Sequence, residues 1–399
     1  MVARVLYVTP RFPVPSETFV AEEVLGMHER GRLVGVVALA CPTADQVGHL
    51  APRSRSVGAL TTYLTRFPVA RALRAITLLS PTVISQAAHL QRRSSVRASS
   101  LARLVRALAV ADFVRTSEAS LIYAHWPRAS EVAYLASIMT GVPFAISVHA
   151  HEVMHDSGHF PILLRAARFS AFCNRAAMTL LARNVPGHEQ RMHLIYHGVD
   201  LERFTANPLP TFSGRLRILA AGRLTPTKGF DRLIRGVAAT TQRGVDVHLQ
   251  IAGVGSALAD LQRLAAELNV ADRVQFLGWV SHEQMPLLLR DVHLFALLAA
   301  TNYHDGLPNA VLEAMASGRA VIVSALPAAH EVITDGVSGL ILRDYNNPEC
   351  FADTCSTLLE DPECMTQIGH AAAAAVHTDH NRAAQLDRLA ALMDESSAC

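Results

Sequence analysis

The sequence lacks several features that mark large classes of protein. None of its apolar runs reaches the roughly 18 residues of a membrane-spanning helix, which excludes an integral membrane protein. Its six cysteines form no Cys-x-x-Cys pair and have no histidine at metal-ligand spacing, so we expect reduced thiols and no zinc site. Neither a Gly-x-Gly-x-x-Gly after the first expected strand nor a Walker motif occurs. A nicotinamide or flavin dehydrogenase and a P-loop nucleotide hydrolase are therefore disfavoured.

Lysine is almost absent. The 36 basic residues are 35 arginines and one lysine, Lys228, and they face 34 acidic residues. A formal net charge of +2 provides no global field that would attract nucleic acid. High-GC coding explains a general preference for arginine, and chance alone could leave one lysine. A single retained lysine is also expected at a site that needs an ammonium group, because a guanidinium is not its geometric equivalent.

The chain has the composition of a globular protein with a large core. Half of its 399 residues are hydrophobic and 18% are charged, and this length favours two or three domains. Short β-branched runs alternate with helical segments in the first half. The N-terminus is expected to form the first strand and not a signal peptide. Strands in this half are expected at residues 4–8, 33–40, 121–124, 144–148 and 194–196.

The same alternation restarts near residue 215. Strands are expected at residues 216–221, 247–252, 274–277, 292–297 and 320–324, with helices between them. Residues 60–111 are expected to form two amphipathic helices, and residues 200–215 a linker. We therefore predict an α/β protein with two doubly wound domains, each a parallel sheet covered by helices. Their expected bounds are residues 1–208 and 209–380, followed by a helix in residues 381–399.

A candidate phosphate site opens the second domain. After the strand at 216–221 comes GRLTPTKG, residues 222–229, which leads into a helix. Arg223 and Lys228 flank a strand-to-helix turn whose unpaired N–H groups favour anions. Such a turn can hold a diphosphate and stabilise it as it departs. The alternative is a pair of surface charges near a helix start.

A second cluster lies at DGLPNAVLE, residues 305–313. Pro308 is expected in the first turn of a helix that runs to about Ser317. Gly306 and Leu307 would then offer backbone N–H groups at the mouth of the helix. Asp305 and Glu313 could line one pocket with their carboxylates. The alternative is a capping aspartate and an exposed helical glutamate.

Taken in order, the motifs of the second half resemble the C-terminal domain of glycosyltransferase family 4. They read GRLTPTKG, LQIAGVGS, VQFLGWVS, DGLPNAVLEAMASG and HEVITDGVSGLIL. The first half fits more loosely, with SETF, YAHW, PFAISVHAHE and HGVDLERF, so that the resemblance covers nearly the whole chain. The family comprises retaining, metal-independent enzymes of the GT-B fold, in which two Rossmann-like domains face a central cleft.

The resemblance implies roles for residues on the donor side. Arg223 and Lys228 match the pair that binds the donor diphosphate and supports its departure. Glu313 matches the second glutamate of a Glu-x7-Glu motif, which hydrogen-bonds the nucleotide ribose. Asp305 replaces the first glutamate, which contacts the donor sugar, and its side chain is one methylene shorter. The loop that cradles the sugar and phosphates is matched by Gly306, Leu307, Pro308 and Asn309.

The resemblance also implies residues on the acceptor side. His149 matches the histidine that faces the reacting sugar and the acceptor, and we expect it to be catalytic together with Arg223, Lys228 and Asp305. Acceptor-binding residues are expected at Ser16, Glu17, Thr18, His125 and His151. For His151 an ordinary loop histidine is an equal alternative. The final helix is expected to pack back on the N-terminal domain, as in the family.

The function implied is that of a hexosyltransferase that moves a sugar from a nucleoside-diphosphate sugar to a hydroxyl group. The acceptor would be a glycan, a lipid-linked compound or a natural product. Uridine diphosphate sugars are favoured because they are the commonest donors in the family, and no cofactor is expected. No Asp-x-Asp occurs, so the metal-holding motif of the other major glycosyltransferase fold is absent. The alternatives are a non-catalytic GT-B protein, which Asp305 would suit, and a GT-B sugar-nucleotide epimerase.

An arginine-rich stretch in the first domain bears on whether the protein contacts a membrane. Residues 46–111 contain ten arginines and neither aspartate nor glutamate. An anionic membrane surface would attract such a stretch, whereas arginines on amphipathic helices are also an ordinary solvated face. Aromatic residues are too sparse there for RNA binding. We expect a bacterial, cytoplasmic protein, and for this stretch peripheral contact with the inner face of the membrane and an ordinary solvated surface are equal alternatives.

Overall fold

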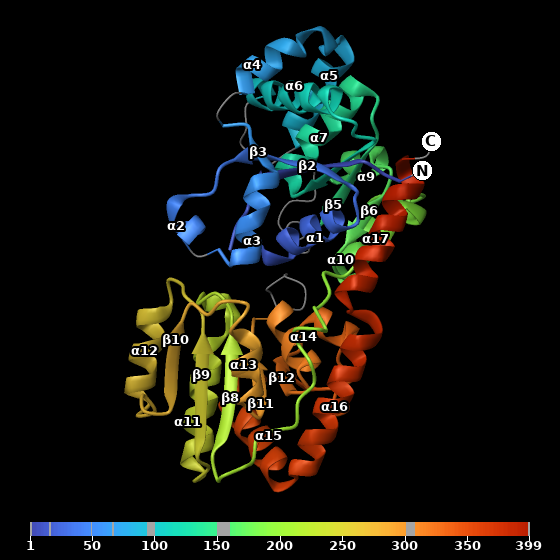
Figure 1. Cartoon of the computed structure of the whole chain (residues 1–399). Helices are drawn as coiled ribbons and strands as arrows, with labels where there is room; N and C mark the ends of the chain where they lie inside the picture. Colours follow the sequence, from blue (N-terminus) through green and yellow to red (C-terminus); the bar gives the residue numbers. More distant parts are fainter. Residues whose placement is uncertain are drawn as a thin grey trace. The chain divides into compact units, whose positions relative to one another are not determined.

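The chain divides into two compact units. The computed structural model describes residues 2–15, 17–48, 50–65, 68–93, 100–149, 160–300 and 308–397. One unit comprises residues 1–197 and 383–399, and the other comprises residues 198–382 (Figure 1). The first boundary therefore falls before residue 198, earlier than the expected residue 208. None of the described helices is long and apolar enough to cross a membrane.

The first unit is built on a seven-stranded parallel sheet in the order β3-β2-β1-β4-β5-β6-β7. Alternate residues of β1 point to opposite faces, with Leu6 in one apolar cluster and Tyr7 in another, so both faces of the sheet are buried. The strands are β1 (Val5–Arg11), β2 (Leu33–Ala40), β3 (Thr61–Tyr63), β4 (Leu121–His125), β5 (Phe144–Val148), β6 (Ser170–Phe172) and β7 (Met192–Leu194).

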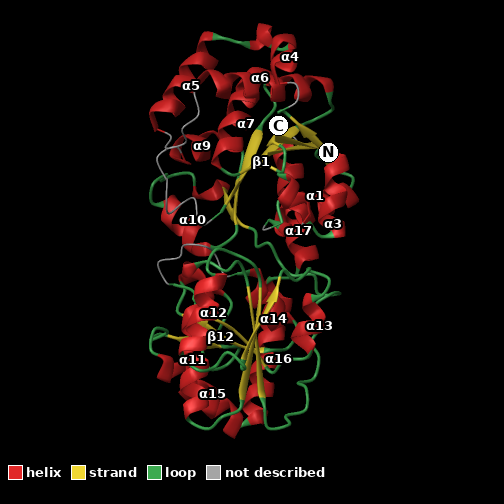
Figure 2. Ribbon diagram, turned by 90° about the vertical axis from the view of Figure 1, so that its left-hand side faces the viewer, coloured by secondary structure: helices red, strands yellow, loops and turns green. Residues whose placement is uncertain are grey.

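Helices cover both faces of this sheet (Figure 2). They are α1 (Thr18–Glu29), α2 (Ala44–Gly48), α3 (Pro52–Ser56), α4 (Pro68–Arg74), α5 (Pro81–Arg93), α6 (Ser100–Thr116), α7 (Pro127–Thr140), α9 (Phe160–Ala166), α10 (Arg175–Ala182) and the last helix of the chain, α17 (Arg382–Ser397). Asp394 on α17 accepts a hydrogen bond from the Ala3 backbone at 2.8 Å and forms an ion pair with Arg32 at 2.6 Å. The chain end is thereby joined to its beginning within one unit.

The second unit has a six-stranded parallel sheet in the order β10-β9-β8-β11-β12-β13. Its strands are β8 (Leu216–Ala221), β9 (Val247–Ala252), β10 (Val274–Gly278), β11 (Leu294–Leu297), β12 (Ala320–Ser324) and β13 (Leu340–Leu342). Its helices are α11 (Phe230–Gln242), α12 (Leu258–Glu267), α13 (Met285–Arg290), α14 (Asn309–Ala316), α15 (Pro348–Glu360) and α16 (Pro362–Asp379). Both sheets therefore follow the nucleotide-binding strand order, in which the order reverses beside the first strand.

The expectation for residues 60–111 was wrong. Instead of two helices, the segment holds the edge strand β3, helices α4 and α5 and the beginning of α6. Prolines 68 and 81 each begin a helix, and this divides the apolar periodicity that had suggested longer helices. Two further strands, β6 and β13, were not predicted, and β7 lies two residues before its expected start. Each of these strands has only three residues, too few to show a period.

The segment expected as a linker packs as part of the second unit. Phe204 is fully buried in the core of that unit. Arg319, also fully buried, donates hydrogen bonds to the backbone oxygens of Val292 at 3.0 Å and Pro208 at 3.1 Å. Burial lowers the pKa of Arg319 to about 10. The guanidinium thus holds residues 207–208 against the sheet, which a solvated linker would not allow.

Candidate active site

In the second unit, the loops after β8 and β11 meet where the strand order reverses. The Ala300 backbone N–H, after β11, donates a hydrogen bond to the Thr227 oxygen, after β8, at 2.9 Å. Open parallel sheets bind ligands at this point, beyond the carboxyl ends of the strands. The candidate phosphate turn therefore lies where such a fold holds a nucleotide.

The turn itself requires glycine. Gly229 has a φ of +71°, and a Cβ there would lie 1.8 Å from the Leu298 oxygen. Lys228, just before it, is buried, whereas Arg223 is exposed and no described residue is hydrogen-bonded to its guanidinium. Helix α11 begins at Phe230 and directs its first N–H groups toward the turn. A buried ammonium, an accessible guanidinium and a helix N-terminus together favour a doubly charged anion.

Helix α14 supplies the second predicted cluster. Pro308 precedes the helix as its capping residue and does not lie in the first turn, one position away from the expectation. Asn309 begins the helix, and Glu313 lies in its second turn with 8% of its surface exposed. Asp305, Gly306 and Leu307 lie outside the described residues. Their roles against the donor sugar and phosphates stay predictions.

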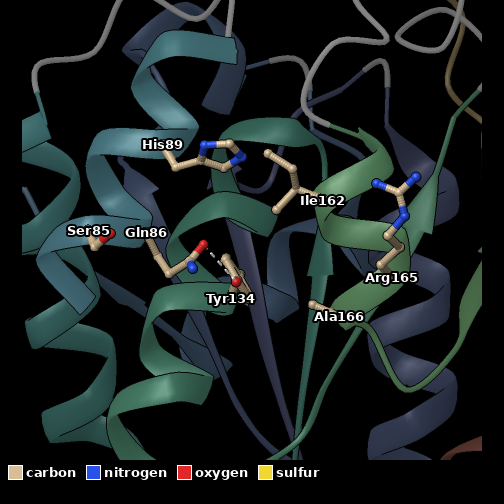
Figure 3. Close-up of a pocket in the computed structure, with 7 residues that line it drawn as sticks. All are labelled: Ser85, Gln86, His89, Tyr134, Ile162, Arg165 and Ala166. Carbon is tan, nitrogen blue, oxygen red and sulfur yellow. Dashed lines mark hydrogen bonds between the residues drawn. The ribbon is translucent and has the colours of Figure 1, made fainter. Parts of the chain in front are cut away.

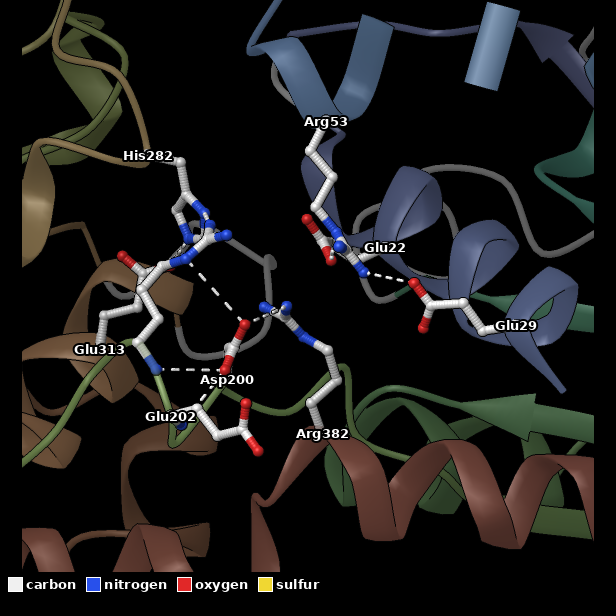
Figure 4. A network of polar contacts seen from close by, with 9 residues as sticks. Glu22, Glu29, Arg53, Asp200, Glu202, His282, Glu313 and Arg382 are labelled. Atoms are coloured by element: carbon white, nitrogen blue, oxygen red, sulfur yellow. Dashed lines mark hydrogen bonds and ion pairs between the residues drawn. The ribbon is translucent and has the colours of Figure 1, made fainter. Parts of the chain in front are cut away.

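A polar network that the sequence did not predict ends on Glu313 (Figure 4). His282 Nε2 lies 3.0 Å from Glu313 Oε1, and His282 Nδ1 lies 2.6 Å from Nη1 of Arg203. Asp200 Oδ2 follows at 4.0 Å from Arg203 and 3.8 Å from Arg382. Arg203 and Asp200 belong to the HGVDLERF motif, and His282 directly follows VQFLGWVS, but nothing in the sequence relates either motif to Glu313.

In the first unit, a second network leads to His149. Tyr7 of β1 donates its hydroxyl hydrogen to Glu23 Oε1 at 3.0 Å, and His125 Nε2, at the end of β4, lies 3.0 Å from the same oxygen. His125 Nδ1 lies 3.3 Å from Nε2 of His149, which follows β5. Both histidines are buried. The predicted catalytic residue and one predicted acceptor residue are thus in direct contact, and Glu23 is an unpredicted member.

The hydrogen-bond donors of this network determine which ring nitrogen of His149 can act as an acceptor. A carboxylate only accepts, so a neutral His125 carries its hydrogen on Nε2 and accepts at Nδ1 from His149 Nε2–H. His149 is then left with an unprotonated Nδ1. Burial lowers the pKa of His149 well below its usual value, and His197 and His125 lower it further. A neutral imidazole of this kind can accept a hydrogen bond or a proton from a hydroxyl group.

Trp126 adds a strained, aromatic element to the same site. It has a φ of +70° and a ψ of +148°, a region that is essentially confined to glycine, directly after β4. Its ring stacks on His149 with centroids 4.1 Å apart, and its Nε1–H donates to Glu17 Oε2 at 3.3 Å. Glu17 was predicted to bind the acceptor, and Thr18 begins α1 beside it. Ser16 and His151 lie outside the described residues.

One group of side chains in the described part of the chain could hold a metal ion. Ligand atoms of His149, Cys173 and His197 lie within 4.8 Å of one another. Two histidines and a thiolate are zinc ligands, and three of them leave one position open. The sequence gave no sign of this group, because its members are separated by more than 20 residues each. The described cysteines form no disulfide.

A pocket of about 450 Å³ lies among the helices of the first unit (Figure 3). Tyr134 on α7 donates a hydrogen bond to Gln86 on α5 at its wall, at 3.2 Å. None of the predicted site residues that the structure describes lines it. Its lining residues are Ser85, Gln86, His89, Tyr134, Ile162, Arg165 and Ala166.

Four of the ten arginines of the acid-free stretch form ion pairs with acids from elsewhere in the chain. Arg53 pairs with Glu22 at 3.0 Å, and Arg71 and Arg74 share Asp112 at 3.1 and 2.9 Å. The fully buried Arg103 pairs with Glu131 at 2.8 Å. The stretch therefore presents less uncompensated charge than its sequence suggested.

Comparison with known proteins gives a family match for the second half of the chain. Residues 203–375 match the model of the family glycosyl transferases group 1. An alpha-D-kanosaminyltransferase of Streptomyces kanamyceticus is 27% identical over 66% of this chain and 73% of that enzyme. A D-inositol 3-phosphate glycosyltransferase of Salinispora arenicola is 29% identical over 60% of this chain, and the match spans about three fifths (61%) of that relative's length.

Solved structures show the same fold over nearly the whole chain. Anabaena HepE, in complex with UDP and glucose, superimposes with a TM-score of 0.70 at 18% identity and covers 98% of each chain. A glycosyltransferase from Rickettsia africae gives a TM-score of 0.73 at 14% identity, covering 99% of each chain. Fold and relatives define the class: this chain is a glycosyltransferase with the GT-B fold. The family match covers residues 203–375, which is less than half of the chain.

Proposed function

We propose that the chain transfers a hexosyl group from a nucleoside-diphosphate sugar to a hydroxyl group, with retention at the anomeric carbon and without a metal ion. The observation that carries this proposal is the turn at residues 222–229. There Lys228 and Arg223 lie in the loop that leads from β8 to the N-terminus of α11, at the place where a parallel sheet binds nucleotides. Breaking the bond between sugar and phosphate loads negative charge onto the diphosphate. Fixed cations and helix amides stabilise that charge in place of a metal.

The first unit would supply the acceptor residues. His149 offers Nδ1 to a hydroxyl group, and Trp126 and Glu17 line the same place. We propose a glycan, a lipid-linked compound or a natural product as acceptor and a UDP-sugar as donor. The relatives are named for kanosamine and for inositol 3-phosphate, and HepE was solved with UDP and glucose. The name with inositol 3-phosphate supports a hydroxylated acceptor, and the HepE complex with UDP supports a uridine nucleotide.

Contact with an anionic membrane, in the cytoplasm, is the further part of this proposal. Four large apolar side chains are exposed on the neighbouring helices α4 and α6 and the turn after α4, namely Val69, Leu73, Ile76 and Leu101. Apolar side chains beside basic residues are what an interfacial surface presents to lipid. Because several of the arginines nearby are ion-paired, the apolar residues would contribute more to binding than the charge count suggests.

The test is turnover of a panel of nucleotide sugars, preceded by binding of their products. A nucleoside diphosphate that binds the folded protein raises its melting temperature by mass action, so uridine, guanosine, adenosine and thymidine diphosphates are compared first. Release of that diphosphate from its sugar conjugate, dependent on Lys228, is the expected result. Binding without any release, across glycan, lipid and small-molecule acceptors, would favour the non-catalytic alternative.

A further inference from the structure

We infer that His282 and Arg203 are positioning residues for Glu313: they orient its carboxylate toward the hydroxyl groups of the donor ribose. The inference rests on the proposed function, because it takes Glu313 as the ribose-binding residue. What it adds is the reason that this carboxylate has one orientation and the identity of the residues that provide it. Neither residue is expected to touch the nucleotide itself.

The direction of each hydrogen bond follows from chemistry alone. An arginine guanidinium has only donors, so Nη1 of Arg203 donates to His282 Nδ1 across 2.6 Å. The ring must then carry its hydrogen on Nε2, which donates to Glu313 Oε1 across 3.0 Å. The imidazole thus links a permanent cation to a carboxylate in one tautomer. Because this bond takes one lone pair of Oε1, the other oxygen and the remaining lone pairs stay available to a ligand.

The contacts that lead from Arg203 through His282 to Glu313 form a relay, and its Arg203 end is held in place as well. The backbone N–H of Arg203 donates to Asp200 Oδ1 at 3.2 Å, and the guanidinium lies 4.0 Å from the same carboxylate. The ring of Phe204, which is fully buried, lies 5.2 Å from the His282 ring. His282 is therefore confined both by its two hydrogen bonds and by its neighbour. A side chain so confined can fix a partner at little further entropic cost.

Because Glu313 and His282 are largely buried, the orientation of the Glu313 carboxylate affects ribose binding. The side chains of His282 and Glu313 are only 15% and 11% exposed. Water can therefore replace the His282 bond only in part, and without the imidazole the carboxylate would rotate toward the solvent that remains. Ribose hydroxyls need an acceptor at a set place, since a displaced acceptor loses the bond but keeps its desolvation cost.

The experiment compares each of uridine, guanosine and adenosine diphosphate with its 2′,3′-dideoxy analogue by calorimetry. The wild-type chain should bind the ribose form about tenfold more tightly, which corresponds to about 1.4 kcal/mol. Glu313→Ala should abolish this preference, and His282→Ala should remove most of it. His282→Gln should retain it, because an amide can accept from Arg203 and donate to Glu313. Arg203→Met should fall between.

Control variants distinguish a loss of the positioning role from a loss of the proposed function and from a failure to fold. His370→Ala removes an exposed histidine of α16 and should keep the full preference. In the double variant Glu313→Ala and His282→Ala, no loss beyond the single Glu313 variant is expected, because the two residues act as one unit. With the cognate nucleotide sugar, His282→Ala should raise KM while kcat stays within about twofold. Urea midpoints show whether each variant folds.

Three results would contradict the inference that His282 and Arg203 position Glu313. If His282→Ala keeps the ribose preference while Glu313→Ala loses it, the proposed function stands and the positioning role is wrong. If His282→Gln fails like the alanine variant despite a wild-type urea midpoint, the relay does not act through its hydrogen bonds. If no diphosphate binds the wild-type chain, the proposed function fails, and this inference fails with it.

Discussion

Acid should destabilise the second unit through His293, a histidine that lies between α13 and β11 and is only 1% exposed. Its Nδ1 accepts a hydrogen bond from the Arg217 backbone at 3.0 Å, and the Phe212 ring packs against it at 5.7 Å. Burial lowers the pKa of His293 to about 4, and the charges of Arg217 and Arg319 contribute in the same direction. The ordinary value for histidine is about 6.5.

The sign and size follow by linkage. Below about pH 6.5 the unfolded chain takes up a proton that the folded chain resists until about pH 4, so stability is present at neutral pH and is lost as the pH falls through that window. A shift of about 2.5 units corresponds to at most about 3 kcal/mol, of which about 2 kcal/mol would be lost by pH 5. His380, whose pKa burial also lowers to about 4, acts in the same direction.

Urea unfolding of the full chain at pH 7 and pH 5 measures this loss. His293→Asn is the informative variant, because its side-chain oxygen can accept from Arg217 but does not titrate. The difference in unfolding free energy between the two pH values should be about 2 kcal/mol smaller in the variant than in the wild type. Equal differences in the two proteins would refute the reasoning, whatever the absolute stability of the variant.

Two predictions concern the chemistry of the donor turn. Lys228→Met should lower kcat by about 100-fold or more, and Lys228→Arg should not restore it, because the residue is buried and a guanidinium is larger and planar. Arg223→Ala should cost a similar factor without a change in melting temperature, and wild-type diphosphate release in any of the three would contradict the assignment. Exhaustive EDTA treatment should leave activity intact. A loss that manganese or zinc restores would refute the metal-free mechanism and direct attention to His149, Cys173 and His197.

The second unit could be predicted closely because its strands are long enough to show a pattern. Strands β8, β9 and β12 have the expected bounds, each being an apolar run closed by a turn-forming residue or by a loop. The glycines 222, 229 and 253 mark the turns around the candidate phosphate site. What failed was the shortest elements, since a three-residue strand is defined by the neighbour it pairs with and not by its own sequence.

The candidate site could be predicted only one residue at a time. Glu313 and His149 were found through motifs, but their partners His282 and His125 are 31 and 24 residues away and belong to other elements. Hydrogen bonds between such residues are created by the sheet topology. The uncompensated charge of the acid-free arginine stretch was overestimated for the same reason, since Asp112 and Glu131, which pair with three of its arginines, lie outside the stretch.

The strained backbone of Trp126 provides a last test of whether a residue needed for acceptor binding lowers the stability of the fold. A non-glycine residue at φ +70° and ψ +148° costs about 1–3 kcal/mol, and this cost falls at the site where the Trp126 ring covers His149. Trp126→Gly and Trp126→Ala both remove the ring, so they differ mainly in backbone strain. We expect the glycine variant to be about 1–2 kcal/mol more stable in urea, the reverse of the order at an unstrained position. Both should transfer sugar to the acceptor at least tenfold more slowly and bind the nucleoside diphosphate unchanged. An alanine variant as stable as the glycine variant would mean that no strain is stored there, and normal transfer in both would mean that the ring has no part in acceptor binding.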